Sequence, residues 1–480
     1  MSFASYIFIF LFLPTTVGIF WLLQRRSIPA GLWALSAASV VFYIQWNPRD
    51  LLVAGTSVLL NYHAARLILK NRQAAKRIFI VAISLNLIAL GYFKYLNFLA
   101  DSIQDLLTNG GPHLAKIALP LGISFFTFTQ IAYLADCLQD KIQPHEHTAR
   151  DYILFVSFFP HLIAGPILHH RTIIPQFHGT FRDHWQAKLQ AGFTLFFIGL
   201  FKKVIIADHF ATLASPVFES ALHGNVIDTP TAWIGALAYT LQIYFDFSGY
   251  SDMAVGSALC IGMHIPFNFQ APYKSTNIID FWRTWHISLS NFLRDYLYIP
   301  LGGNRKGPSR RYINIFITML LGGIWHGAGL NFMIWGALHG AFITINHAWR
   351  DFGPRTLIKS IPAPIYTTAS YLFTLFAIIT AWVFFRAESF PAACHVLKAM
   401  VVPTVTSHQV SSSPDWLSGV LIVLGFLFTL TLPNSKEIHD WVLGGITRQT
   451  TAILGLSCGA VAAISFIFIS ADSPFLYFNF

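Results

Sequence analysis

The sequence predicts an all-α protein built from roughly 11 to 14 transmembrane or re-entrant helices. Of its 480 residues, 55% are hydrophobic and only 11% are charged, and the mean hydropathy is +0.56. A soluble protein of this length needs far more polar surface. The apolar residues also gather in blocks of about 20, the length of helix that crosses a bilayer. We therefore expect a polytopic membrane protein.

The first apolar block covers residues 6–23, and we expect it to stay in the protein. Its positive charges, Arg25 and Arg26, follow the apolar run, and no small-residue cleavage pattern comes after it. A removable signal peptide has its positive charges before the apolar run and a cleavage site behind it. A signal peptide is therefore not predicted.

The remaining blocks follow along the rest of the chain. They cover residues 30–46, 51–69, 78–99, 117–135, 152–167, 192–207, 233–247, 253–269, 313–325, 330–347, 366–385, 417–432 and 452–469. Several are short or interrupted by proline and glycine, as at Pro160, Gly165 and Gly322. Irregular backbone at membrane depth must be lined by protein or water, so some of these segments are expected to re-enter instead of crossing.

Lysine and arginine in the short loops predict the orientation. Arg25 and Arg26 follow the first block and four cations lie in residues 70–77, whereas the loop between them carries only Arg49. Cytoplasmic loops hold the excess of positive charge, which places the amino terminus outside. The basic cluster in residues 305–311 is assigned to the cytoplasm for the same reason. This loop asymmetry accounts for most of the net charge of +10, and no soluble segment is long enough for a nucleic-acid site.

Two histidines lie in the stretch between residues 314 and 349. His326 comes fifteen residues after Arg311, about 22 Å along a helix, which places it deep in the bilayer. His339 is thirteen residues further, so on a straight helix the two rings would face nearly opposite sides, about 220° apart. They could act together only if the chain bends at residues 327–329, where two glycines permit it. A buried histidine is costly in a membrane, although packing explains such residues more often than catalysis.

Residues 279–295 predict an amphipathic helix that is too polar to span. Apolar side chains recur at positions 281, 285, 289, 292 and 296, with polar groups largely elsewhere. Such a helix lies at the membrane surface or lines a cavity. His286 would then face inward beside Trp282 and Leu293. An interfacial anchor with aromatic-belt tryptophans is an equally open alternative.

Two aspartates, Asp246 and Asp252, interrupt the apolar region around residues 244–256. Carboxylates at this depth must be paired or face water. We expect a structural ion pair that holds a re-entrant turn, with Lys274, Arg283 or Arg294 as the partner. The histidines at positions 145, 147, 169 and 170 lie in polar loops without metal-ligand spacing, and we expect them to be solvated and to bind no metal.

Several longer motifs resemble those of the membrane-bound O-acyltransferase family, in particular its bacterial alginate O-acetylation branch. The motifs occupy residues 119–125, 165–166, 244–252, 281–290, 298–304, 323–327, 335–340, 382–387 and 475–478. Their order extends the resemblance over nearly the whole chain. It implies one domain over residues 1–480 around a central catalytic funnel, with amino-terminal spans in 1–135, a catalytic core in 136–350 and carboxy-terminal spans in 351–480.

The resemblance implies transfer of an acetyl group from cytoplasmic acetyl-CoA, with no permanently bound cofactor, in the bacterial inner membrane. The acceptor would be a periplasmic partner protein that O-acetylates an exopolysaccharide such as alginate. Alternatives are a subunit for O-acetylation of peptidoglycan or another cell-wall polymer, a transporter with a histidine-lined path, and a noncatalytic scaffold. The family's polar residue upstream of the essential histidine has no unambiguous match, and only Arg283 and Thr284 stand near its place.

By resemblance, His326 matches the family's essential histidine and His286 its second motif histidine. A thioester is already activated, so the enzyme mainly needs a base for the acceptor hydroxyl, a task that a neutral imidazole in apolar surroundings can perform. No Gly-x-Ser-x-Gly elbow supports a covalent nucleophile. The expected substrate-binding residues near the two histidines are Trp285, Trp325, Arg283, His339 and Asp246.

Overall fold

The computed structural model describes residues 1–108, 116–179, 181, 183–354, 360–403, 416–444, 448–469 and 475–476. The described residues are helical or irregular, without a strand, as the sequence predicts. The chain divides into two compact units. The first unit contains residues 1–200, 250–267 and 439–479, and the second contains residues 201–249 and 268–438.

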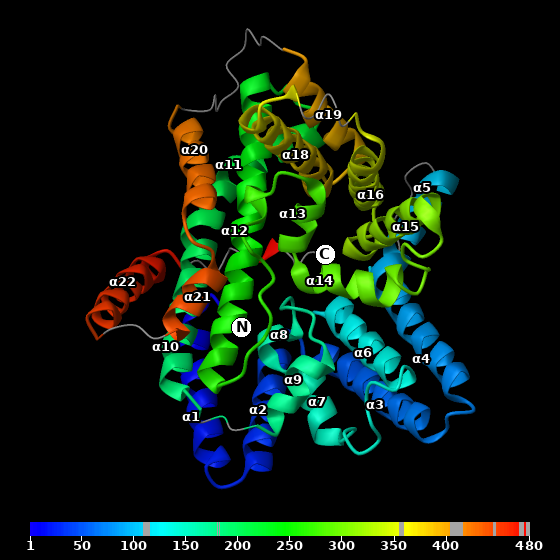
Figure 1. Cartoon of the computed structure of the whole chain (residues 1–480), viewed down its shortest axis with the longest axis vertical. Helices are drawn as coiled ribbons and strands as arrows, with labels where there is room; N and C mark the ends of the chain where they lie inside the picture. The colour runs from blue at the N-terminus through cyan, green and yellow to red at the C-terminus, as the bar shows by residue number, and fades with distance from the viewer. Residues whose placement is uncertain are drawn as a thin grey trace. The chain divides into compact units, whose positions relative to one another are not determined.

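The first unit is built mainly from the amino-terminal half of the chain (Figure 1). Its helices are α1 (Leu13–Gln24), α2 (Ile28–Ile44), α3 (Pro48–Lys70), α4 (Ala75–Leu90), α5 (Leu96–Thr108), α6 (Ile123–Leu138), α7 (Ala149–Ser157), α8 (Phe159–Leu162), α9 (His170–Phe177), α10 (Trp185–Phe201) and α22 (Arg448–Ile467). The start of α3 follows from its sequence, because the Asn47 side chain accepts a hydrogen bond from Arg49 N and Pro48 occupies the first helical position.

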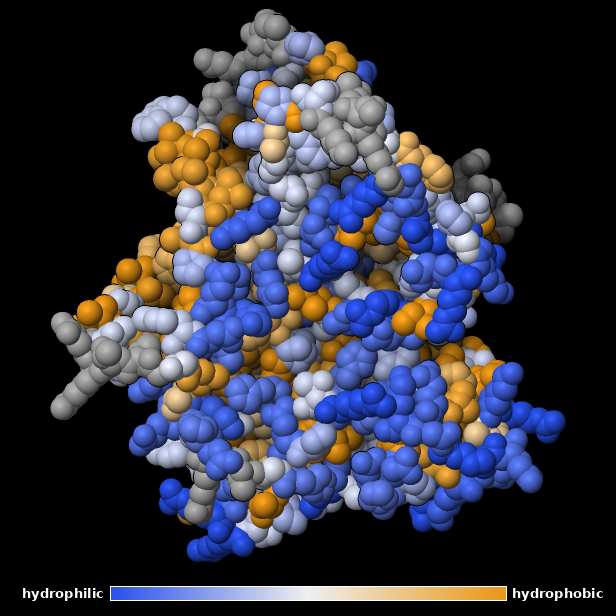
Figure 2. Space-filling view, in the orientation of Figure 1, coloured by the Kyte–Doolittle hydropathy of each residue, from blue (hydrophilic) through white to orange (hydrophobic). Residues whose placement is uncertain are grey.

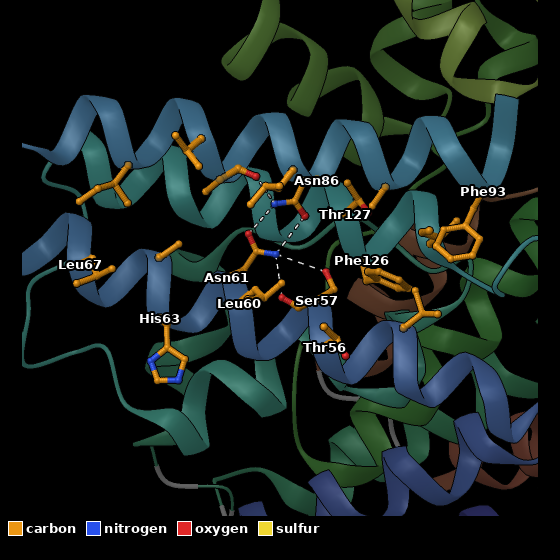
Figure 3. A pocket seen from close by; sticks show the side chains of 18 of the residues that line it. Thr56, Ser57, Leu60, Asn61, His63, Leu67, Asn86, Phe93, Phe126 and Thr127 are labelled. Atoms are coloured by element: carbon orange, nitrogen blue, oxygen red, sulfur yellow. Dashed lines mark hydrogen bonds between the residues drawn. The ribbon is translucent and has the colours of Figure 1, made fainter. Parts of the chain in front are cut away.

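A cavity of about 850 Å³ lies between α3, α4 and α6 in this unit (Figure 3). Its polar centre is a pair of buried amides: Asn61 Nδ2 donates to Asn86 Oδ1 at 3.1 Å, and Asn86 Nδ2 donates to Asn61 Oδ1 at 2.7 Å. Ser57 joins the pair because its carbonyl also accepts from Asn61 Nδ2. Each amide donates a hydrogen bond to the other, and this reduces the cost of burying two polar side chains on apolar helices.

The second unit carries the motifs singled out by the sequence. Its helices are α11 (Asp208–Leu222), α12 (Thr229–Ile261), α13 (Ile278–Thr284), α14 (Ile287–Leu293), α15 (Gly307–His326), α16 (Leu330–Phe352), α18 (Ala363–Arg386), α19 (Phe390–Val401), α20 (Trp416–Thr431) and the beginning of α21 (Ser435–Leu443). The last part of α12, from Tyr250, belongs to the first unit.

Helices α15 and α16 form an antiparallel pair whose backbones meet at glycines. A Cβ atom on Gly336 would lie 2.5 Å from the backbone oxygen of Met319 and 3.0 Å from Gly323 Cα. A Cβ atom on Gly340 would lie 3.1 Å from Phe316 Cα. Small residues of this kind let membrane helices approach closely. The pair is therefore packed backbone to backbone along several turns.

Five described helices are long and apolar enough to cross a membrane, or six if the pair α20 and α21, bent by 43°, counts as one span. The five segments are Pro48–Lys70, Ala75–Gln104, Trp185–Leu222, Ala363–Arg386 and Thr450–Ile467. Large apolar side chains are exposed on such helices, as on α20 and α22 at the left of Figure 2, where they suit contact with lipid. Shorter apolar helices, among them α2 and α6, accompany these spans.

The block at residues 192–207 lies within a helical segment that runs from Trp185 to Leu222 through a π-helical turn at Lys202–Ala207 and is long and apolar enough to cross a membrane. Two local expectations were wrong. Residues 233–247 and 253–261 form one continuous helix, α12, so Asp246 and Asp252 lie on helical backbone and not in a re-entrant turn. Residues 279–295 do not form one amphipathic helix, because the chain breaks between α13 and α14.

Candidate active site

His326 is the last residue of α15, at the bend that the glycines permit. Gly327 and Gly329 are both extended, and α16 begins directly afterwards at Leu330. Any side chain at Gly327 would overlap with the ring of Phe332. A larger residue here would force the Phe332 ring to move, and the bend turns the chain back so that α16 packs along α15.

Aromatic rings surround the His326 imidazole. It is 3% exposed, and its ring centroid lies 4.8 Å from that of Trp325, 4.9 Å from Trp335 and 5.3 Å from Phe385. Trp335 comes from α16 and Phe385 from the end of α18, so residues of three helices surround the ring. The ring is therefore shielded from water by aromatic side chains.

His339 joins the same cluster from α16. It is fully buried, and its ring centroid lies 4.8 Å from that of Trp335. Trp282 Nε1 of α13 donates a hydrogen bond to His339 Nδ1 at 3.2 Å, so the proton of a neutral His339 is on Nε2. The bend thus brings His326 and His339 against one indole, that of Trp335, although a straight helix would have separated them.

His286 occupies the break between α13 and α14. Its φ of 42° is left-handed, a conformation that costs a non-glycine residue about 1–3 kcal/mol. Asn268 holds the break, because Ile287 N donates to its carbonyl at 3.0 Å and Ser288 N to its Oδ1 at 3.1 Å. The imidazole is fully buried and packs edge-on against Phe247 at 4.7 Å. Backbone strain that the surroundings maintain at a buried histidine is characteristic of functional sites.

Indole rings connect the break with the cluster around His326. The Trp285 ring lies 4.9 Å from that of Trp382, and Trp382 lies 6.0 Å from Trp335. Trp335 in turn contacts His326. All three tryptophans are at most 1% exposed. The motif histidines, distant in sequence, therefore belong to one aromatic cluster within the second unit, as expected of a site that three separate motifs build.

Comparison with known proteins gives this cluster its context. The model of the membrane-bound O-acyltransferase family matches residues 68–386, which include all three histidines. The chain belongs to the membrane-bound O-acyltransferase family. It is a membrane O-acyltransferase, and the sequence-based recognition is confirmed.

Similar proteins are named after different polymers. A probable alginate O-acetylase of Pseudomonas aeruginosa is 43% identical over 83% of this chain and 75% of its own length. A peptidoglycan O-acetyltransferase of Helicobacter pylori is 38% identical over 100% of this chain and 98% of its own length. A teichoic acid D-alanyltransferase of Bacillus subtilis is 28% identical over 52% of this chain and 63% of its own length.

The structure assigns Asp246 of this O-acyltransferase a partner that the sequence did not suggest. Lys203, on the π-helical turn, lies 2.8 Å from Asp246 and 2.7 Å from Asp208. Lys203 and Asp246 have side chains only 3% and 1% exposed. Two of the expected cations pair with other carboxylates: Arg283 binds Asp280 at 2.9 Å, and Arg294 binds Asp295 at 2.7 Å. The ion pair itself was predicted correctly, but its cation was not.

Other predicted residues fall outside the aromatic cluster. The Arg283 side chain is 70% exposed, so it does not line the buried site. His147 and His170 were expected to be solvated but are buried: His147 Nδ1 lies 2.9 Å from the Tyr133 hydroxyl, and His170 Nδ1 lies 2.9 Å from Asp136 Oδ2. Among the described residues, no group of three His, Cys, Asp or Glu side chains could hold a metal ion.

Sequence reasoning missed the residues that surround the histidines: Asn268, Trp335, Trp382 and Phe385. Trp335 precedes His339 by four residues, which is one helical turn, and this spacing could have placed both on one face of α16. The last two lie in a quoted motif, residues 382–387, that received no role. Nothing local in the sequence distinguishes Asn268 from an ordinary loop asparagine.

Proposed function

We propose that this protein transfers an acetyl group from acetyl-CoA, supplied at the cytoplasmic face of the bacterial inner membrane. The acetyl group passes toward a periplasmic partner protein that O-acetylates an exopolysaccharide such as alginate. The observation that carries the proposal is the enclosed His326 ring at the bend between α15 and α16, in contact with Trp335. The similarity to probable alginate O-acetylases supports the choice of polymer.

The chemistry needs one base and an ordered approach of two substrates. His326 takes the proton of the acceptor hydroxyl while its oxygen forms a bond to the thioester carbon. The carbon–sulfur bond then breaks, and the CoA thiolate recovers a proton as the free thiol. A positioned base of this kind contributes typically 10²- to 10⁴-fold to the rate. The apolar rings around His326 exclude water, which would otherwise compete for the acetyl group.

His286 and His339 have supporting roles in this proposal. The hydrogen bond from Trp282 leaves His339 with its donor at Nε2, suited to orient a substrate carbonyl or hydroxyl. His286 is held by the backbone break at Asn268, and a fixed imidazole at this position orients the donor or relays the proton. Trp285 and Trp325, each next to a motif histidine, supply apolar contact area for the acyl group.

A cell-wall polymer is the second candidate acceptor. The peptidoglycan O-acetyltransferase of Helicobacter pylori aligns with the full length of this chain. This coverage supports peptidoglycan as the alternative acceptor. The transporter alternative is set aside, because the chain belongs to a family of acyltransferases. The two acceptors differ only in the polymer that the partner modifies, and the same base serves either.

The test is thioester turnover by the purified protein in lipid nanodiscs, supplied with acetyl-CoA and with membranes that contain the partner and polymer. Released CoA thiol and acetyl ester on the polymer are measured for the wild type, for His326→Ala and for His326→Gln. His223→Ala is the matched control, because His223 is an exposed histidine of the same unit. We expect wild-type turnover for the control and a loss of at least 10²-fold for both His326 variants.

Three outcomes would contradict the proposal. Thiol release by His326→Ala at the wild-type rate would remove His326 as the base. A wild-type protein that releases no thiol even with its partner present would support a scaffold. Acetyl ester found on peptidoglycan instead of exopolysaccharide would replace the acceptor and leave the chemistry intact.

A further inference from the structure

The cavity between α3, α4 and α6 in the first unit has apolar walls that open toward the bilayer. Leu60 of α3 and Leu85 of α4 line it, and each is more than half exposed. Both helices belong to segments that are long and apolar enough to cross a membrane. The cavity volume of about 850 Å³ lies within the range of about 300–1,000 Å³ that is typical of ligand sites. A ligand that enters here therefore comes from the lipid phase.

The buried amides at the centre of the cavity need no hydrogen bond from a ligand. Besides the two bonds between them, Asn61 Nδ2 donates to Ser57 O at 2.9 Å, and Asn86 Nδ2 donates to Ala82 O at 2.8 Å. Both hydrogens of each amide group are thus used, and each side-chain oxygen has a donor. A polar occupant would lose its own hydrogen bonds to water here without replacement, so hydrocarbon fits this part of the cavity best.

One end of the cavity carries a positive charge. Arg77, in the first turn of α4, lines this end next to the hairpin that joins α3 to α4. His63 and Leu67 of α3 line the same end, at the left of Figure 3. In the hairpin, Arg72 pairs with Asp140. Arg77, in contrast, is exposed and has no carboxylate partner among the described residues, so it is available to an anion.

The surroundings of Arg77 favour an anionic ligand over a zwitterionic one. Arg66, Lys70 and Lys76 are exposed cations near the same hairpin. The ammonium group of a zwitterionic headgroup would approach these cations, whereas an anionic headgroup brings only negative charge to them. The excess of positive charge also assigns this hairpin to the cytoplasmic side. Basic pockets between membrane helices on that side bind anionic lipid headgroups.

The cavity is about one leaflet deep. Its lining on α4 runs from Arg77 to Ala89, which is twelve residues or about 18 Å along the axis. One leaflet contributes half of a hydrocarbon core of about 30 Å, which is about 15 Å. A phosphate bound at Arg77 would therefore place an acyl chain along the apolar length of the cavity. The chain would end near Phe93 and Phe126, at the right of Figure 3.

We propose that this cavity binds an anionic diacyl phospholipid of the cytoplasmic leaflet, with its phosphate on Arg77 and an acyl chain over the amide pair. The guanidinium donates two parallel hydrogen bonds to the phosphate oxygens, a geometry that the ammonium group of lysine lacks. The lipid covers apolar side chains that α3 and α4 leave exposed. The site is independent of acetyl transfer, because every residue that lines it belongs to the first unit and the motif histidines belong to the second.

The test is native mass spectrometry of the full-length protein, released from detergent micelles that contain phosphatidylglycerol or phosphatidylcholine. The fraction of protein with one bound lipid gives an apparent Kd for each lipid. We expect phosphatidylglycerol to bind about tenfold more tightly than phosphatidylcholine. Arg77→Ala should weaken the binding of phosphatidylglycerol about tenfold, and Arg77→Lys should recover part of the loss. Lys76→Ala is the matched control and should weaken it less, because Lys76 is an exposed neighbour that does not line the cavity.

A second pair of variants tests the hydrocarbon part of the site. Ala89→Trp fills the cavity from an exposed position of α4, whereas Ile88→Trp places the same indole on the adjacent exposed position, outside the cavity. We expect Ala89→Trp to weaken phosphatidylglycerol binding about tenfold, since the acyl chain loses buried apolar area. Ile88→Trp should bind as the wild type does. Glycerol phosphate, which has the headgroup charge without the chains, should not displace the lipid at equal concentration.

Four outcomes would overturn the proposal. The first is phosphatidylcholine that binds as tightly as phosphatidylglycerol, and the second is an Ala89→Trp protein with wild-type affinity for phosphatidylglycerol. Displacement of the lipid by glycerol phosphate would assign the site to a water-soluble phosphate compound. A protein subunit that copurifies with the wild type and with Ile88→Trp, but not with Ala89→Trp, would assign the cavity to a helix of a partner.

Discussion

Replacing Gly336 by alanine tests whether the close packing of α15 and α16 sets the geometry of the candidate active site. The new Cβ atom would lie 2.5 Å from Met319 O, and ordinary contact begins at 3.4 Å, so the helices must separate by about 0.9 Å at this point. The nearest atoms, Met319 O and Gly323 Cα, belong to the backbone, so no side chain can move aside. Overpacking of this kind typically costs 1–3 kcal/mol.

The substitution is also expected to lower the rate of catalysis. Gly336 follows Trp335, which contacts both His326 and His339. A displacement of about 1 Å at a catalytic group can cost 10²-fold in rate, because the reacting atoms no longer meet in line. We therefore expect Gly336→Ala to lower the kcat of thiol release by about 10²-fold while CoA binding is kept.

The matched control is Gly419→Ala on α20, where a Cβ atom would meet nothing within 4 Å. Alanine is the better helix former by roughly 0.5–1 kcal/mol, so this variant should be as stable as the wild type or more so, and fully active. Both variants are compared by thiol release and by thermal unfolding in detergent. A Gly336→Ala protein with wild-type kcat would show that the packing of α15 against α16 does not set the position of Trp335.

Three further predictions concern residues whose contacts the structure defines. Lys203→Met separates the nearly buried Asp246 from its cation and should cost about 3–5 kcal/mol of unfolding free energy; if Lys203→Met and Asp246→Asn have additive effects in the double variant, the pair is not coupled. His286→Val should be less stable than His286→Asn by about 1–2 kcal/mol, since asparagine tolerates the left-handed backbone and a β-branched residue does not; equal melting temperatures would contradict this. Trp282→Phe removes the donor to His339 and should cost about 1–3 kcal/mol in thermal unfolding, so an unchanged Tm would indicate that another group replaces the indole N–H.

Much of the fold class and the motif histidines could be predicted from the sequence. Composition decides membrane insertion, and the glycines at 327 and 329 indicate the bend that makes His326 and His339 neighbours of one ring. The cation for Asp246 could not be predicted, because Lys203 lies 43 residues away in the sequence, in a separate apolar block. Pairing across helices leaves no local pattern.

The break at His286 could not be predicted for a related reason. The apolar spacing of residues 279–295 fits a continuous helix, and the spacing alone gives no indication of the left-handed residue. Asn268, eighteen residues earlier, supplies the acceptors that replace the missing helical hydrogen bonds. Periodicity shows which side chains would share a face of a helix. It cannot show that a side chain distant in sequence binds the backbone and ends the helix.

The paired amides Asn61 and Asn86 have a consequence for biogenesis. Asn61 lies near the middle of α3, Asn86 lies within the helical segment Ala75–Gln104 that begins with α4, and these helices are neighbours in sequence. A single such helix would enter lipid with an amide oxygen that has no donor, which is costly, whereas the two amides together supply a donor to each oxygen. The translocation machinery should therefore release α3 and α4 as one hairpin, before the motif-bearing half of the protein has been synthesised.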